Sequence, residues 1–141
     1  MEKIYYSLDQ ARRLLPEISR RFRKIRRIKE AVDLLESIEI ESEDYSMEFD
    51  LVDLEIQKRY HKLMHNLFKE VQELTKVGII VKDIDMGLVD IYSKFDGRDI
   101  FLCWCFGELT IDHWHEVDAG YENRKSVSLI EKNNRSNFKH H

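Results

Sequence analysis

The first third of the chain has apolar residues at the three- and four-residue steps of an amphipathic helix. Ser7 and Gln10 form a capping-box pattern, which predicts that a helix begins near Leu8. Proline is tolerated in the first turn of a helix but breaks its interior. Pro16 therefore predicts a short helical turn followed by a long helix from about Pro16 to Ser37, either kinked or split at the proline. The apolar stripe of the long helix is Ile18, Phe22, Ile25, Ile28, Val32 and Leu35.

A second amphipathic helix is expected after a polar, acidic connection at residues 39–48. It extends from about Phe49 to Val77, and Gly78 ends it because glycine takes a left-handed conformation at low cost. Its apolar stripe is Ile56, Tyr60, Leu63, Leu67, Val71 and Leu74. Two antiparallel helices of this length form a hairpin that buries one stripe against the other.

From Ile79 onward the apolar period changes from about 3.6 residues to 2, which is typical of strands. Strands are expected at residues 79–81, 88–95, 98–106, 109–115 and, as an edge strand, 126–130. Asp96-Gly97 is a strong signal for a two-residue hairpin turn, and Gly107-Glu108 can form a second tight turn.

These elements predict an α+β fold in a single domain over residues 1–141. A long antiparallel helix hairpin, about 8–77, packs on one face of a small, mainly antiparallel sheet within about 78–130. The polar residues from about 131 to 141 are expected to be disordered.

The turn at Asp96-Gly97 fixes which strand residues share a face of the sheet. It pairs Asp90 with Cys103, and Ile91 with Leu102. One face is then apolar and must be covered by the helices; it carries Val89, Ile91, Ile100, Leu102, Trp104 and Phe106. The opposite face, which we call the mixed face, carries Asp90, Tyr92, Phe101, Cys103 and Cys105.

Extending this count through a two-residue turn at Gly107-Glu108 assigns the next strand to the two faces. Asp112, Trp114 and Glu116 then fall on the mixed face, and His113 and His115 fall on the core face. A slip of one residue reverses the assignment.

Composition and charge restrict the classes of function. Charged residues make up 35% of the chain, more than the usual quarter, so much of the surface is charged helix. Residues 12–29 carry nine Lys or Arg and one acid, whereas residues 30–57 carry eleven Asp or Glu and no Lys or Arg. The basic run could contact phosphates, but it lacks interleaved aromatic residues and the net charge is −4, so a solvated helix face is favoured over nucleic-acid binding.

The sequence also bears on location and assembly. The chain has no apolar run long enough to span a membrane and no signal-peptide pattern at its start, so a cytoplasmic protein with reduced Cys103 and Cys105 is expected. A small sheet does not cover both helical stripes, and an exposed stripe promotes association. We therefore expect a homodimer formed through the helices.

Three carboxylates lie within eight residues of one another and next to Lys82: Asp83, Asp85 and Asp90. Carboxylates this close can bind a divalent cation or take different protonation states for acid–base chemistry. They can equally shape a turn. We favour the turn for Asp85, and a role in a site for Asp83 and Asp90.

The segment His113-Trp114-His115-Glu116 is the second candidate. Imidazole beside a carboxylate can act as a general base or bind a metal ion. A histidine that hydrogen-bonds the backbone at a strand end is the alternative, and for either histidine alone it is the commoner arrangement. His115 together with Glu116 and Arg124 leaves the two interpretations equally open.

Other histidine and cysteine patterns give weaker signals. His61 and His65 share a face of the second helix, but Lys62 stands where the HExxH zinc motif has its glutamate. Cys103 and Cys105 supply at most two zinc ligands without a second pair, so they are interpreted as small buried apolar residues.

Several segments resemble the signature of an uncharacterised prokaryotic family known only as a domain of unknown function, some members of which carry a cell-division label. The matching segments are YSLDQARRLLPEI, GIIVKDIDMGLVDI, DGRDIFLCW, FGE and WHEVDAGYENR. They cover about residues 5–20 and 78–124. The resemblance implies no established activity or cofactor, and His61, His65, Cys105 and His113 stand outside the family pattern.

We therefore expect a small-ligand site, whose catalytic function is open, on the mixed face. Asp90, His115 and Glu116 would transfer protons or bind a metal ion, and Lys82 and Arg124 would hold a small anion. Asp83 would be a further ligand-binding residue, and Tyr92 and Trp114 would wall the pocket. This convergence requires that the strand containing His115 slips from the simple face count. The alternatives are a helix-mediated interaction module without a small-molecule site and, third, a nucleic-acid adaptor.

Overall fold

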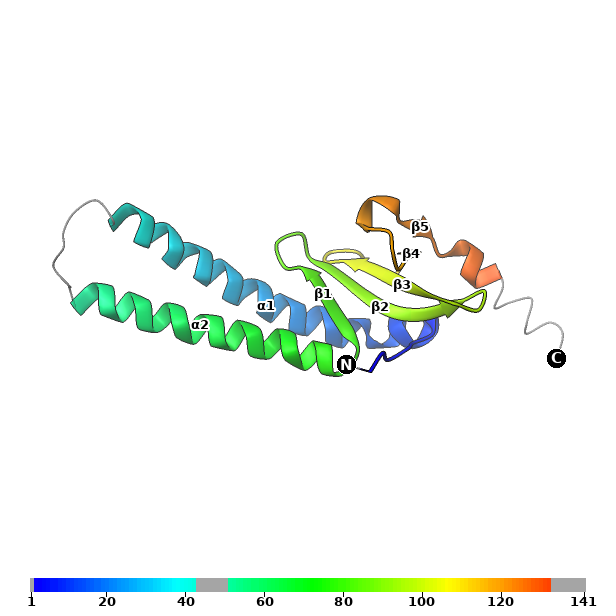
Figure 1. Cartoon of the computed structure of the whole chain (residues 1–141), viewed down its shortest axis with the longest axis horizontal. Helices are drawn as coiled ribbons and strands as arrows, with labels where there is room; N and C mark the ends of the chain where they lie inside the picture. The colour runs from blue at the N-terminus through cyan, green and yellow to red at the C-terminus, as the bar shows by residue number, and fades with distance from the viewer. Residues whose placement is uncertain (1, 43–50, 133–141) are drawn as a thin grey trace.

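The fold consists of a long helix hairpin and a five-stranded antiparallel sheet. A computed structural model describes residues 2–42 and 51–132 of the chain. The helices are α1 (Leu8–Ser42) and α2 (Leu51–Lys76). The strands are β1 (Ile79–Asp83), β2 (Leu88–Phe95), β3 (Arg98–Cys105), β4 (His113–Glu116) and β5 (Lys125–Ser126), in the spatial order β1-β2-β3-β4-β5. Figure 1 shows the sheet against one end of the hairpin, so the predicted α+β class is confirmed.

Helix α1 begins at the predicted capping box. The N–H of Ser7 donates to Gln10 Oε1 at 2.9 Å, and the N–H of Gln10 donates to Ser7 Oγ at 3.1 Å. The helix continues through Pro16, so the predicted alternative of two helices split at the proline is wrong. Buried residues on both sides of the proline, among them Leu15 and Ile18, belong to one core, and this packing holds the helix together across the missing backbone donor.

Helix α1 is also longer than predicted. It continues to Ser42, and the first four residues of the expected acidic connection are therefore helical. The rest of that connection lies outside the described residues. None of the described helices combines the length and the apolar character needed to cross a membrane.

The β2–β3 hairpin has the predicted register. Asp90 pairs with Cys103, and Ile91 pairs with Leu102. The turn residues Asp96 and Gly97 have φ angles of 53° and 74°. Positive φ at both central residues is the geometry of a type I′ turn, whose twist matches that of the flanking strands.

The connection from β3 to β4 differs from the prediction. Residues 106–112 form a loop instead of a two-residue turn, and the strand begins at His113 instead of 109. Cys103 pairs with His113, whereas the predicted turn would have paired it with Asp112. This slip of one residue reverses the face count: His113 and His115 lie on the mixed face, and Trp114 lies in the core.

The physical cause of the slip lies in the loop itself. The N–H of Glu108 donates to the Cys105 carbonyl at 2.9 Å, and the indole N–H of Trp104 donates to the Glu108 carbonyl at 3.0 Å. Ile111 is fully buried in the core. The chain therefore turns tightly after β3 and then uses additional residues to insert Ile111 before β4 begins.

The predicted edge strand at 126–130 is also wrong. Strand β5 contains only Lys125 and Ser126, and residues 128–132 are helical. Ile130 is buried in the core, and Glu131 forms an ion pair with Arg12 of α1 at 2.8 Å. The chain leaves the sheet because this segment packs beside the start of α1.

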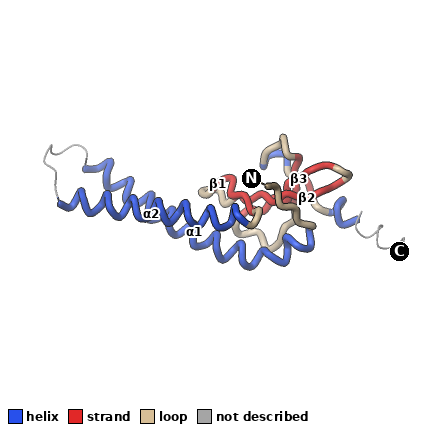
Figure 2. Tube along the Cα trace, turned by 60° about the horizontal axis from the view of Figure 1, so that its bottom comes forward, coloured by secondary structure: helices blue, strands red, loops and turns tan. Residues whose placement is uncertain are grey.

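The core lies between the two helices and one face of the sheet. It includes the predicted core-face residues Val89, Ile91, Ile100, Leu102 and Trp104. From α1, Phe22 contacts Trp104 edge to face, with ring centroids 6.2 Å apart. Figure 2 shows both helices continuing well past the sheet. Leu34, in the second half of α1, is 63% exposed.

The mixed face is covered by two chain segments. Tyr5 from the N-terminal segment packs against Tyr92, with ring centroids 5.9 Å apart. The segment after β4 adds Val117 and Tyr121, which line a cavity beside Asp90. This cover explains how an acid on an outer face of the sheet becomes buried.

Candidate functional site

Three potential metal ligands meet on the mixed face. Asp90, Cys103 and His115 come from β2, β3 and β4, which are adjacent strands. Asp90 pairs with Cys103, while His115 pairs with Phe101, two residues before Cys103 on the same face. One carboxylate oxygen, the thiol sulfur and one imidazole nitrogen all lie within 4.8 Å of one another. The three residues are at most 4% exposed.

The hydrogen bonds of His115 define its tautomer. Nδ1 lies 2.8 Å from the backbone carbonyl oxygen of Glu116. Because a carbonyl oxygen can only accept, Nδ1 carries the hydrogen. Nε2 lies 3.0 Å from Asp90 Oδ1. A neutral imidazole therefore presents a lone pair to the carboxylate, and the contact requires a cation, either a proton or a metal ion, between the two atoms.

Cys103 is the third donor and is a protonated thiol in the absence of a metal ion. Burial and the adjacent carboxylate of Asp90 raise the pKa of Cys103 to about 12, and Arg124 opposes this shift. A metal ion would replace the thiol proton, because the thiolate is the form of cysteine that binds metals.

Lys82 shares the mixed face with Asp90, because Ile80 pairs with Asp90 and Lys82 lies two residues further along β1. Val81 and Asp83 of β1 pair with successive residues of β2, Val89 and Leu88, which leaves Lys82 as the extra residue between them. Bulges change the direction of a side chain and are common beside active sites. The bulge at Lys82 therefore lies beside the three-donor cluster.

A cavity of about 180 Å³ lies beside the three donors. Its lining consists of Lys82, Leu88, Asp90, Phe101, Cys103, His115, Val117, Ala119, Gly120 and Tyr121. The Lys82 ammonium lies 4.9 Å from the centre of the Phe101 ring, a cation–π contact. The donors are therefore buried and still accessible to a small molecule.

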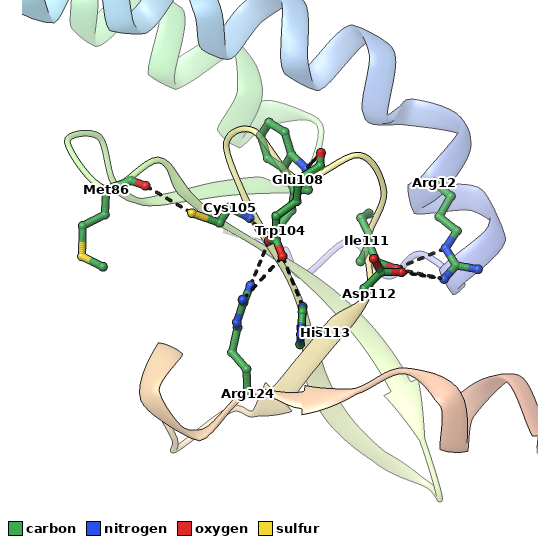
Figure 3. A network of polar contacts seen from close by, with 9 residues as sticks. All are labelled: Arg12, Met86, Trp104, Cys105, Glu108, Ile111, Asp112, His113 and Arg124. Carbon is green, nitrogen blue, oxygen red and sulfur yellow. Dashed lines mark hydrogen bonds and ion pairs between the residues drawn. The ribbon is translucent and has the colours of Figure 1, made fainter.

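A second polar network lies next to the cavity, around Glu108 (Figure 3). Glu108 Oε1 accepts from the N–H of Cys105 at 2.6 Å and from Arg124 Nη1 at 2.9 Å. Burial acts to raise the pKa of Glu108, but the hydrogen bonds from Arg124 and Cys105 outweigh it, and the pKa is lower than usual. Arg124 also stacks on Tyr121, at 4.6 Å from the ring centre.

His113 is the unsatisfied member of this network. Its Nδ1 is buried and has no hydrogen-bond partner in the described part of the chain, although Glu108 Oε2 lies 3.3 Å away in unfavourable geometry. His113 pairs with Cys103 across β3 and β4, so it lies beside the three-donor cluster without being one of its donors.

The predicted convergence holds for part of the residue set. Asp90 and His115 are hydrogen-bonded, and Lys82 lines the same cavity. Glu116 points away from them: Arg98 Nη2 donates to its Oε1 at 2.7 Å. Trp114 packs in the core, so it does not wall the pocket.

The remaining predicted residues have identifiable local contacts. Asp83 Oδ1 accepts from the N–H of Met86 at 2.9 Å and so shapes the turn before β2. Asp85 is exposed and forms an ion pair with Lys29 at 3.3 Å. Tyr92 lies on the mixed face and packs on Phe101, with ring centroids 4.4 Å apart.

Sequence reasoning missed Cys103 and Glu108. For Cys103 a signal existed, since the turn at Asp96-Gly97 already placed it opposite Asp90. The interpretation of Cys103 as a small apolar residue rests only on the fact that Cys103 and Cys105 lack the second pair of cysteines found in zinc motifs. For Glu108 the one signal is its place in the FGE segment of the family signature, because its contacts depend on the loop after β3 and on Arg124, 16 residues later.

Comparison with known proteins identifies a family and no characterised relative. Neither the curated proteins nor the solved structures include a match to this chain. The family described as "Uncharacterized conserved protein (DUF2203)" matches residues 4–127, which is most of the chain. The protein therefore belongs to this uncharacterised family, as the sequence resemblance implied.

Proposed function

We propose that the protein binds a divalent transition-metal ion, with Zn²⁺ as the best fit, through Asp90, Cys103 and His115. The observation that carries the proposal is the pair His115 Nε2 and Asp90 Oδ1, 3.0 Å apart with Nδ1 already hydrogen-bonded to a carbonyl. A cation must lie between these atoms. Cys103, within 4.8 Å of both, supplies a third ligand that a shared proton would not need.

The donor set fits zinc. Imidazole nitrogen, thiolate sulfur and carboxylate oxygen are its usual ligands, and donors in a tetrahedral site lie about 3.3–3.7 Å apart. The contact between His115 Nε2 and Asp90 Oδ1, at 3.0 Å, therefore needs only a small expansion to hold the ion. The hydrogen bond from Nδ1 to the Glu116 carbonyl orients the ring, as outer contacts of metal-binding histidines do.

Three protein ligands leave one coordination position open, and the cavity adjoins it. Zinc sites of this type hold a water molecule, lower its pKa and use it as a nucleophile. Metal-assisted hydrolysis or hydration of a small molecule is the reaction class that this arrangement supports. A thiolate ligand needs a reducing environment, and both cysteines are free thiols, which supports a cytoplasmic location.

Metal binding by reduced, purified protein tests the proposal. We expect one Zn²⁺ or Co²⁺ per chain by elemental analysis, with a sulfur-to-cobalt absorption band for Co²⁺. Cys103→Ser should remove this band, and His115→Ala should lower the affinity for metal by a factor of 10 or more.

Matched controls come from the same two strands. Cys105→Ser and His113→Ala change the same residue types outside the cluster, so both variants should retain the ion. Wild-type protein that binds neither metal would overturn the proposal. Loss of the cobalt band in Cys105→Ser instead of Cys103→Ser would overturn this ligand assignment.

A second candidate function, self-association, is favoured by an exposed strip on α1. Arg27, Ala31, Leu34 and Ile38 follow one another at helical spacing on one face, which we call the outer strip. Leu34 and Ile38 are 63% and 40% exposed, and Arg27 has no ion pair among the described residues. An antiparallel second copy would cover the apolar residues and bring the basic half of one α1 against the acidic half of the other.

A further inference from the structure

We infer that the cavity beside the metal ligands binds a small monocarboxylate, whose charge is balanced by Lys82. The inference rests on the proposed metal site and names the class of molecule that would occupy its open position. Three observations support it: the direction of Lys82, the charge of the cluster, and the size and lining of the cavity.

Lys82 is a free cation at the cavity. Its position two residues after Ile80, the partner of Asp90, puts its side chain on the mixed face, and its ammonium contacts the Phe101 ring at 4.9 Å. The described residues provide no carboxylate within ion-pair distance of it. Lys82 is exposed and also lines the cavity, so its ammonium is available to an anionic ligand there.

The charge of the site selects a monoanion. A divalent ion with one carboxylate, one thiolate and one neutral imidazole has no net charge. Lys82, an exposed residue at the rim of the cavity, then adds one positive charge that attracts an anion. Arg124 does not change this sum, because Glu108 pairs with it at 2.9 Å. One negative charge on the ligand completes the balance, which favours a carboxylate over a phosphate dianion.

The cavity favours a short ligand with an apolar part. Its volume of about 180 Å³ is below the roughly 300 Å³ at which ligand pockets for drug-sized molecules begin. Leu88, Phe101, Val117 and Ala119 form an apolar wall. A carboxylate group between the metal ion and Lys82 would direct a chain of a few carbon atoms along this wall.

The experiment uses the Co²⁺-loaded full chain with propionate as the probe. Propionamide has the same shape without the charge, and inorganic phosphate has a higher charge. We expect propionate to shift the cobalt visible spectrum and to bind at least tenfold more tightly than either of the other two probes, measured by the same titration.

Variants of two lysines identify the residue responsible. Lys82→Gln should weaken propionate binding at least tenfold, as expected for a lost charge-assisted hydrogen bond, while the cobalt content stays at one per chain. Lys82→Arg should restore part of the affinity. Lys125→Gln is the matched control, because Lys125 lies over Trp114 outside the cavity, and its propionate affinity should equal that of the wild type.

The outcomes separate the two proposals. Wild-type protein that binds cobalt but binds propionate no better than propionamide, or that prefers phosphate, overturns the monocarboxylate inference and leaves the metal site standing. Unchanged propionate affinity in Lys82→Gln overturns the role of Lys82. Failure to bind cobalt overturns the proposed function, and the monocarboxylate inference with it.

Discussion

At the scale of single residues, Gly87 determines how the turn before β2 meets the end of β3. Its φ angle is 77°, and a Cβ atom added to it would lie 2.6 Å from Phe106 Cβ. The N–H of Phe106 donates to the Gly87 carbonyl at 2.8 Å. The two backbones approach this closely only because residue 87 has no side chain, and the approach fixes the start of the strand that carries Asp90.

Gly87→Ala should therefore destabilise the fold by about 2–4 kcal/mol, as the sum of left-handed backbone strain and steric overlap. Gly97→Ala is the matched control: its φ is 74°, but a Cβ atom added there would meet nothing within 4 Å, so only the strain of about 1–2 kcal/mol applies. Urea denaturation of both variants measures the difference. Equal losses of stability in the two variants would show that Phe106 moves away from the new Cβ atom without a cost in free energy.

At the scale of elements, the parts that could be predicted are those determined by local chemistry. The capping box at Ser7 and the turn at Asp96-Gly97 specify geometry through residues next to one another in the sequence. The turn also specified the register that places Asp90 opposite Cys103. The α+β class follows from the change of period at Gly78.

The position of β4 could not be predicted, because it depends on contacts distant in sequence. Burial of Ile111 in the core and the hydrogen bonds around Glu108 determine the length of the preceding loop. That length decides on which face His115 lies. The His115–Asp90 contact was expected only by assuming a slip that the pattern itself did not indicate.

An ion-pair group within α1 gives a pH-dependent contribution to stability. Hydrogen bonds from Arg20 and then Arg21 lower the pKa of Glu17 from 4.5 to about 2. Because the folded-state pKa is the lower one, the stabilisation is complete above about pH 4.5 and is lost as the pH falls toward 2.

Glu17→Gln should therefore melt at a lower temperature than the wild type at pH 7, and the difference should shrink between pH 4.5 and pH 2. Circular dichroism melts across this range measure it. Glu30→Gln is the control, since Glu30 has no ion pair among the described residues, and its difference from wild type should not depend on pH in this way. If the melting temperature of Glu17→Gln stayed below that of the wild type by the same amount at every pH, the pH-dependent contribution could not be assigned to Glu17.

At the scale of the whole molecule, charge is separated along the hairpin. The basic residues of α1 lie in its first part, and the described acidic residues in the second half of α1 and the first part of α2 include Glu30, Asp33, Asp53 and Glu55. Like charges at one end of a helix pair repel one another. An antiparallel second copy across the outer strip would place opposite charges together.

Light scattering coupled to gel filtration should show a dimer at micromolar concentration and a larger monomer fraction at 1 M NaCl, because salt screens charge pairing. Leu34→Glu should shift the protein to monomer by placing a charge in the outer strip. Leu129→Glu, at a position 54% exposed and outside the strip, should leave the mass unchanged. A monomeric wild type at high micromolar concentration would refute self-association.

The order of the strands has a kinetic consequence. Each strand hydrogen-bonds the next one along the chain, from β1 to β5, and the two helices before them are also consecutive. Each of these pairings closes a short loop, and chains dominated by such local contacts cross a low entropic barrier. We expect the docking of α1 onto the sheet to be the later and slower event, because it brings together residues far apart in the sequence, such as Arg12 and Glu131.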